Sequence, residues 1–171
     1  MTGFDPDALL EVLHRHDVRY VLIGGLAAAL RGSVTPTFDV DITPDVSIEN
    51  LARLSTALTD LDARIRVDGI PEGIPFSHDA ASLAQMTMLN LVTRSGDLDV
   101  AFDPAGVGDY SRWEAGAASV TVLGVPVQVA SLDDIIRSKE AADRGKDRLQ
   151  LPLLRALQQR LRRRDKPPDG S

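Results

Sequence analysis

Apolar residues in this chain of 171 residues recur at two spacings. Some recur every three or four positions, which places them on one face of a helix, and others alternate with polar residues, which places them on one face of a strand. Glycine, proline and aspartate separate the segments, as expected at turns and helix ends. The pattern predicts helices over 6–16, 26–32, 48–61, 131–145 and 149–163, a short helix or turn over 109–117, strands over 20–23, 63–67, 87–93 and 98–102, a strand that carries Asp39 and Asp41, and a hairpin over 119–129.

The segment 20–44 carries the most specific chemistry of the sequence. An apolar strand leads into Gly24 and Gly25 at the start of a short helix, where open backbone N–H groups favour phosphate. The next strand carries Asp39 and Asp41, which share one face because strand side chains alternate. Two adjacent carboxylates repel each other unless a proton or a cation relieves the repulsion, and such oxygen ligands suit Mg²⁺ or Mn²⁺. The segment therefore predicts a site for a nucleotide with Mg²⁺; the alternative is a βαβ turn with two solvated acidic residues.

A second acidic cluster lies around the turn between the strands 87–93 and 98–102. By alternation, Asp97, Asp99 and Asp103 share the face opposite to the apolar side chains. A third aspartate beside the first pair would complete a site for two divalent ions. Taken alone, the cluster could also be an exposed acidic hairpin.

Together these motifs resemble the nucleotidyltransferase superfamily with a polymerase-β-like core. Its signature is a strand, a Gly-Ser or Gly-Gly turn, a helix, and a strand of the pattern hDhDh, in which h is apolar; Gly24-Gly25 and Thr37-Phe38-Asp39-Val40-Asp41 match it. The chain is most similar to the AbiEii and MenT-like toxin nucleotidyltransferases of bacterial toxin–antitoxin systems, which often read GG…R-x-T-x-D-I-D, although Thr35 stands here at the arginine position. The resemblance implies an α/β (α+β) nucleotidyltransferase fold, in which helices flank a mixed central β-sheet, with a C-terminal helical segment.

The resemblance also implies roles for individual residues. Asp99 would supply the third carboxylate, with Asp97 as the alternative. Lys139 would reach the β- and γ-phosphates of a nucleotide as a flexible point charge; the alternative is a surface ion pair. The implied catalytic residues are Asp39, Asp41, Asp99 and Lys139; the implied nucleotide-binding residues are Gly24, Gly25, Thr37, Lys139, Lys146 and Asp147; and the implied metal ligands are Asp39, Asp41 and Asp99.

The implied function is transfer of a nucleoside monophosphate from an NTP, with Mg²⁺ (or Mn²⁺), to an acceptor hydroxyl. By resemblance the acceptor would be the 3′ end of tRNA, so that the protein would act as a toxin that blocks translation and is restrained by a cognate antitoxin. Two alternatives share this chemistry: adenylylation of a protein hydroxyl, and inactivation of an aminoglycoside-type antibiotic. A third alternative is a binding module that has lost catalysis, which is favoured by Thr35 and by the lack of a second aspartate near Leu151.

Composition narrows the class of protein further. There is no cysteine, which excludes disulfides and thiolate metal sites. The net charge of −6 argues against indiscriminate binding to nucleic acid. One strongly basic run, 160–166, could bind an RNA backbone or an acidic partner, but cations also favour helix C-termini. Apolar runs are too short to span a membrane and the N-terminus is acidic, so a cytoplasmic location without a membrane partner is expected.

The predicted organisation is a single domain with a helical appendage. It comprises a core over 1–130, C-terminal helices over 131–166 packed on that core, and a disordered tail over 167–171.

Several segments are interpreted as peripheral. Arg64 and Arg66 alternate with apolar residues and are interpreted as charges on an edge strand, with contact to a polyphosphate as the alternative. The segment 68–82 is rich in glycine and proline and is predicted to be a loop beside the active site. Pro126 is interpreted as part of an edge strand, because proline cannot donate to a sheet.

Overall fold

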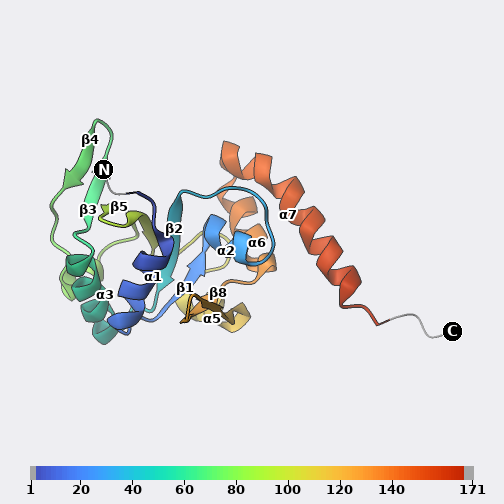
Figure 1. The fold of residues 1–171 in the computed structure, drawn as a ribbon, viewed down its shortest axis with the longest axis horizontal. Coiled ribbons are helices and arrows are strands. Elements are labelled where there is room, and N and C mark those ends of the chain that lie inside the picture. The colour runs from blue at the N-terminus through green and yellow to red at the C-terminus, as the bar shows by residue number, and fades with distance from the viewer. Residues whose placement is uncertain (1–2, 168–171) are drawn as a thin grey trace.

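The computed structural model describes residues 3–167 and is built on one eight-stranded mixed β-sheet (Figure 1). Across the sheet the strands follow the order β4-β3-β5-β6-β2-β1-β8-β7, and helices flank them, which confirms the predicted fold class. The strands are β1 (Tyr20–Ile23), β2 (Asp39–Pro44), β3 (Arg64–Val67), β4 (Ile70–Ile74), β5 (Met88–Thr93), β6 (Gly96–Ala101), β7 (Ala118–Val122) and β8 (Val125–Val129). The helices are α1 (Pro6–Arg15), α2 (Gly24–Leu30), α3 (Ile48–Asp60), α4 (Ala80–Leu83), α5 (Tyr110–Gly116), α6 (Leu132–Ala142) and α7 (Gly145–Arg164).

The helices form two groups around the sheet. α1 and α3 pack together, whereas α6 contacts both α2 and α7, and Figure 1 shows these groups on different sides of the molecule. Leu9 and Leu13 of α1 and Leu54 of α3 are fully buried, because their helical spacing directs them to one face. The side chains of Asp5 and Ser47 accept backbone N–H groups in the first turns of α1 and α3. The apolar stripes and the caps therefore explain where these helices begin and which face they bury.

β2 is the strand on which the acidic motif lies, and it is hydrogen-bonded on both sides. It runs antiparallel to β1 and parallel to β6. Val40 is fully buried, and its neighbours Asp39 and Asp41 point to the opposite face of the sheet. The register sets Asp41 opposite Asp99 and Asp39 opposite Asp97 on β6. The pairing of β2 with β6 therefore brings the two acidic motifs together on one face.

The segment 68–82 is not the loop that its composition predicts, because it contains β4 and the short helix α4. Gly69 has a φ of +81°, which suits glycine and lets the chain reverse after β3. β4 pairs with β3 and forms the edge of the sheet, so the interpretation of β3 as an edge strand is wrong. Four of the five residues of β4 are exposed, which leaves no apolar alternation for a sequence pattern to reveal.

The interpretation of the strand containing Pro126 as an edge strand is also wrong. β8 lies between β1 and β7, and β7 forms the edge. β8 meets β1 through the pair Leu22 and Val129, at the far end of the strand from Pro126. The missing N–H of Pro126 therefore costs no bond to β1.

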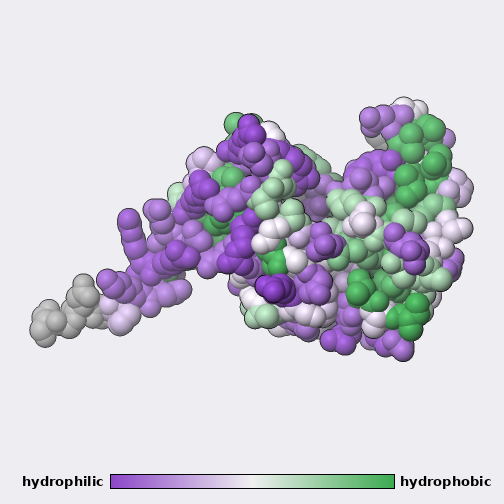
Figure 2. Space-filling view, turned by 180° about the vertical axis from the view of Figure 1, so that it is seen from behind, coloured by the Kyte–Doolittle hydropathy of each residue, from purple (hydrophilic) through white to green (hydrophobic). Residues whose placement is uncertain are grey.

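The C-terminal helices differ from the prediction at their junction. α7 begins at Gly145 rather than at 149, because the side chain of Asp147 accepts the backbone N–H of Arg144 and closes the first turn. Lys146 and Asp147 therefore lie on the first turn of α7, close to α6. The last turns of α7 project from the body as a largely hydrophilic arm (Figure 2).

Two features concern the chain as a whole. Within residues 3–167, no helix combines the length and the apolar character needed to cross a bilayer. The predicted tail, 167–171, lies outside the described residues apart from Pro167.

Candidate active site

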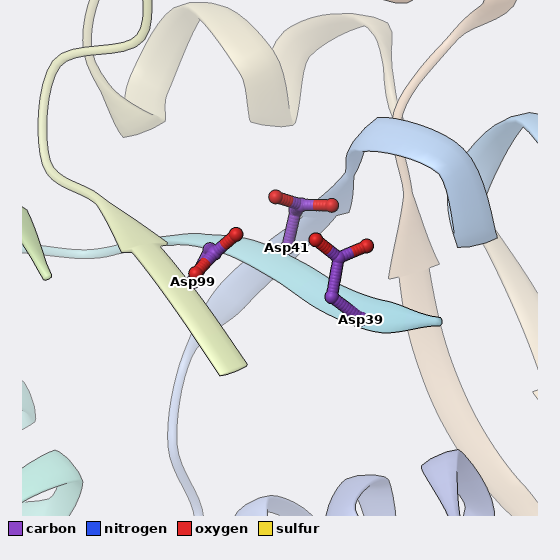
Figure 3. A group of neighbouring side chains, drawn as sticks. All are labelled: Asp39, Asp41 and Asp99. Atoms are coloured by element: carbon purple, nitrogen blue, oxygen red, sulfur yellow. The ribbon is translucent and has the colours of Figure 1, made fainter. Parts of the chain in front are cut away.

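Three carboxylates converge on one face of the sheet, as Figure 3 shows. Asp39 and Asp41 come from β2 and Asp99 from β6, and one oxygen of each lies within 4.8 Å of an oxygen of the other two. Asp99 is only 8% exposed. Asp97 is paired in register with Asp39 but does not belong to this group of three. The geometry thus favours Asp99 over Asp97 as the third ligand.

The turn after β1 lies directly against these carboxylates. Gly24 has a φ of +69°, and a Cβ atom built on it would lie 2.7 Å from the Cγ atom of Asp41. A Cβ atom on Gly25 would lie 2.9 Å from the Oγ1 atom of Thr37. Because real Cβ atoms do not approach so closely, only glycine lets the start of α2 sit against β2 here. The two glycines thus start α2 directly after β1, and the structure adds that they bring the backbone close to the acidic group. Their contact with phosphate stays a prediction.

Thr37, which the sequence predicts to bind nucleotide, also contacts the acidic motif. Its Oγ1 atom lies 3.2 Å from the backbone oxygen of Asp39 and 3.3 Å from its Oδ1 atom, so the hydroxyl donates within the acidic motif. Thr37 also lines the cavity beside the glycine turn. It therefore holds Asp39 in place from the cavity wall.

Two carboxylates of this group, Asp41 and Asp99, have raised pKa values. Burial, followed by the nearby charges of Asp39 and Asp99, raises the pKa of Asp41 to about 7. Burial raises the pKa of Asp99 to about 6, although the positive charge of Arg66 opposes the shift. The negative charges of this group are therefore not balanced by nearby positive charge. A divalent cation bound by the carboxylate oxygens would balance them. The donor set fits Mg²⁺ or Mn²⁺.

These shifts predict how stability depends on pH without metal. Both groups have a higher pKa in the folded state than the usual value of about 4, so between about pH 4 and pH 7 the folded state binds more protons than the unfolded state. The free energy of unfolding should therefore fall as the pH rises through this window. Mg²⁺ held by the ionised carboxylates of the folded state would raise the melting temperature by several degrees at pH 8 and very little at pH 5.

Thermal unfolding in EDTA and in millimolar Mg²⁺, at matched ionic strength, measures this difference. Equal stabilisation at both pH values would contradict a metal site at these carboxylates.

Basic side chains lie on the opposite wall, which α6 and α7 supply. Lys139 is not a surface ion pair, because its side chain is only 11% exposed; its Nζ atom lies 2.8 Å from Gln150 Oε1 and 3.3 Å from Asp147 Oδ1. Asp147 is fully buried and also accepts from the Nε atom of Arg144 at 2.8 Å. Burial acts to raise the pKa of Asp147, but the hydrogen bond from Arg144 and the charge of Lys139 hold it below its usual range. Asp147 therefore anchors two cations beside the acidic group.

Two adjoining cavities give access to this centre. One, of about 300 Å³, is lined by Gly24, Gly25 and Thr37, and the other, of about 820 Å³, extends past Asp99. Both are bordered by the residues that the cavities share, namely Gly24, Asp39, Asp41, Asp97, Lys139, Arg144 and Lys146. The acidic group therefore borders open space on two sides, and Asp99 lines only the larger cavity.

Arg66 is the site residue that the sequence reasoning placed elsewhere. It lines the larger cavity, and its two Nη atoms lie 2.7 Å from Asp97 Oδ2 and 2.5 Å from Asp99 Oδ1. Its alternation with Ile65 and Val67 is a signal that could have placed it on the acidic face. Arg144, which the sequence reasoning did not count among the binding residues, lines both cavities.

Comparisons with known proteins bear on the fold. No protein-family model matches the sequence, and no curated protein sequence matches it. Among solved structures, the lincosamide antibiotic adenylyltransferase LnuA, bound to lincomycin, aligns over 88% of this chain and 94% of its own with a TM-score of 0.56 and 18% identity. ANT(2″)-Ia in complex with adenylyl-2″-tobramycin aligns over 92% of this chain and 95% of its own, with a TM-score of 0.54 and 18% identity. A candidate nucleotidyltransferase from Thermotoga maritima, TM1012, aligns over 89% of each chain with a TM-score of 0.52 and 17% identity. The chain therefore has the nucleotidyltransferase fold.

Proposed function

We propose that the protein transfers a nucleoside monophosphate from an NTP to an acceptor hydroxyl, with Mg²⁺ or Mn²⁺ as the cofactor. The observation that carries this proposal is the convergence of Asp39, Asp41 and Asp99 against the Gly24 turn in a nucleotidyltransferase fold. Asp39 and Asp41 would hold the metal, and Asp99 would share it. Bound there, divalent ions would neutralise charge on the triphosphate and on the departing pyrophosphate.

The side chains of the site have distinct tasks in this reaction. The acceptor oxygen forms a bond to the α-phosphorus, the bond from that phosphorus to the β-phosphate oxygen breaks, and pyrophosphate leaves. Asp99 accepts the proton of the acceptor hydroxyl, a role that suits a carboxylate whose pKa is raised to about 6. Lys139, Lys146 and Arg144 line the cavity wall where they can neutralise the phosphates. Most of the catalysis then comes from positioning and charge, since the protein forms no covalent bond.

The finer expectation for the acceptor is the 3′ end of tRNA, with the protein acting as a toxin under a cognate antitoxin. It is supported by the resemblance of the GG and T-x-D-V-D motifs and by the basic arm of α7. Within the described residues, Arg160, Arg163 and Arg164 are exposed and form no ion pair, so they remain available to a phosphate backbone or an acidic protein.

A second candidate acceptor is a small cationic compound with a hydroxyl group. Besides Asp39, Asp41 and Asp99, the larger cavity is lined by the carboxylates of Asp68, Asp97 and Asp103, and Arg66, which also lines it, is already paired. Carboxylates in this number attract amines. LnuA and ANT(2″)-Ia, which share the fold, act on antibiotics.

One transfer assay tests the function and chooses between these acceptors. The purified protein is incubated with each NTP labelled at the α-phosphate, Mg²⁺, and either tRNA, cellular protein, or a panel of aminoglycosides and lincosamides. We expect label on an acceptor and release of pyrophosphate, and neither with the Asp41→Asn variant. Label on tRNA supports the toxin, label on a protein band supports protein adenylylation, and label on an amine-bearing compound supports the cationic acceptor. NTP binding without transfer to any of them would contradict the proposed function and favour a binding module.

A further inference from the structure

Arg66 bridges two carboxylates at the edge of the acidic group. It comes from β3, and β5 lies between β3 and β6, on which Asp97 and Asp99 stand. Its guanidinium reaches across β5 and places one Nη atom on each carboxylate, at 2.7 Å from Asp97 and 2.5 Å from Asp99. The planar fork of arginine matches such a pair of acceptors, and lysine could serve only one of them at full strength.

The bridge leaves the two carboxylates in different states. Asp99 accepts from Arg66 through Oδ1 and also belongs to the group of three with Asp39 and Asp41. Asp97 lies outside that group of three and holds the other Nη atom of Arg66. Asp97 therefore holds the guanidinium of Arg66, and Arg66 in turn orients the carboxylate of Asp99.

We propose that Arg66, anchored by Asp97, is a positioning residue that fixes the carboxylate of Asp99 for nucleotidyl transfer. The inference rests on the proposed function. Arg66 acts through Asp99 rather than on substrate, because its guanidinium is already bonded to both carboxylates. Without the bridge the carboxylate of Asp99 is free to rotate. The entropic cost of fixing that side chain then falls on each turnover and each metal-binding event.

Transfer kinetics are the first test. Arg66→Gln should lower kcat by roughly 10- to 100-fold, the range for residues that orient a catalytic carboxylate, with little change in the KM for NTP. Arg66→Lys should recover part of the loss, because it restores one charged hydrogen bond. Arg64→Gln is the matched control: Arg64 lies on the same strand, pairs with Asp62 at 3.8 Å and lines neither cavity. It should retain wild-type kcat.

The role of Asp97 is tested by a double-mutant cycle with Arg66. Asp97→Asn should lower kcat several-fold, because Arg66 loses one of its two partners. In the Arg66→Gln background the same change should have almost no further effect. If the two substitutions instead lower kcat by factors that multiply in the double variant, Asp97 acts separately from Arg66, and the proposal that Asp97 acts through Arg66 is overturned.

A third test does not depend on activity. Binding of Mn²⁺ alone, followed by electron paramagnetic resonance, should weaken several-fold in Arg66→Gln and stay near wild type in Arg64→Gln, with equal melting temperatures as the check on folding. Tighter Mn²⁺ binding in Arg66→Gln would overturn the proposal, since Arg66 would then compete with the cation. If the wild type transfers no nucleotide, the proposed function fails and this binding measurement still decides the role of Arg66. If the wild type is active and Arg66→Gln matches Arg64→Gln in kcat, the inference alone fails.

Discussion

Asp41→Asn should abolish nucleotidyl transfer and at the same time make the protein more stable at pH 8. Asp41 lies between the other two carboxylates of the group and beside Gly24, so the amide removes a metal ligand with little change in shape. We expect a loss of transfer of roughly a thousand-fold or more, as for removal of a group that organises transition-state charge.

The gain in stability follows from the sign of the pKa shift. The pKa of Asp41 is raised to about 7, so at pH 8 the folded state holds an ionised carboxylate that burial and Asp39 disfavour. The neutral amide removes this cost, worth roughly 2 kcal/mol after allowance for the partial solvent access of Asp41, or about 5 °C in melting temperature. At pH 5 the wild-type group is largely protonated, and the difference should be small.

Thermal unfolding in EDTA at both pH values, together with the transfer assay, measures this pair of effects. Asp45→Asn is a useful control, because Asp45 lies just after the same strand, does not line either cavity and pairs with Arg19 at 3.4 Å. A variant that is inactive and also less stable than the wild type at pH 8 would argue that Asp41 is a structural residue.

Gly24→Ala should lose both transfer and stability, in contrast to Asp41→Asn. The new Cβ atom would lie 2.7 Å from the Cγ atom of Asp41, and the residue would have to keep a φ of +69°. Relief of the clash must move α2 or the carboxylate. A displacement on the order of 1 Å can cost about a hundred-fold in rate, and the strained backbone about 1 to 3 kcal/mol.

Gly145→Ala provides the matched control for this substitution. Gly145 begins α7, its φ lies outside the left-handed region, and a Cβ atom there would meet no other atom within 4 Å. We expect its stability to be unchanged or slightly higher, since alanine favours a helix. Kinetics and chemical unfolding of the two variants side by side measure the effect. Normal transfer by Gly24→Ala would show that the close approach of the turn to Asp41 is dispensable.

The acidic strand could be predicted from sequence because local rules determine it. Alternation predicts the strand that carries Asp39 and Asp41 and places them on one face, and the apolar run 20–23 predicts β1. The sequence favours Asp99 over Asp97 because it predicts Asp97 to lie in the turn, whereas β6 begins at Gly96 and contains both residues. The parallel pairing of β2 and β6 separates them, because it sets Asp99 opposite Asp41. That pairing itself is a long-range contact, and the resemblance to known motifs rather than periodicity predicted it.

The errors have physical causes that local patterns do not carry. β4 buries only one of its five residues, so its presence was hidden, and without it β3 looked like an edge. The same gap makes the sequence pattern place Arg66 on a surface edge, although its partners lie two strands away in the sheet. The burial of Lys139 could not be predicted either, because it depends on where the first turn of α7 packs against α6 and on the buried carboxylate of Asp147.

Because β2 lies inside the sheet, the two walls of the site differ in rigidity. A strand with a hydrogen-bonded neighbour on each side cannot shift without breaking two ladders, so the backbone under Asp39 and Asp41 is a rigid floor. The cations on the facing wall lie instead on or beside α6 and α7, two helices in contact with each other, of which α6 also contacts α2. We therefore expect movement that accommodates a ligand to fall to this wall, while the backbone that carries Asp39 and Asp41 stays fixed.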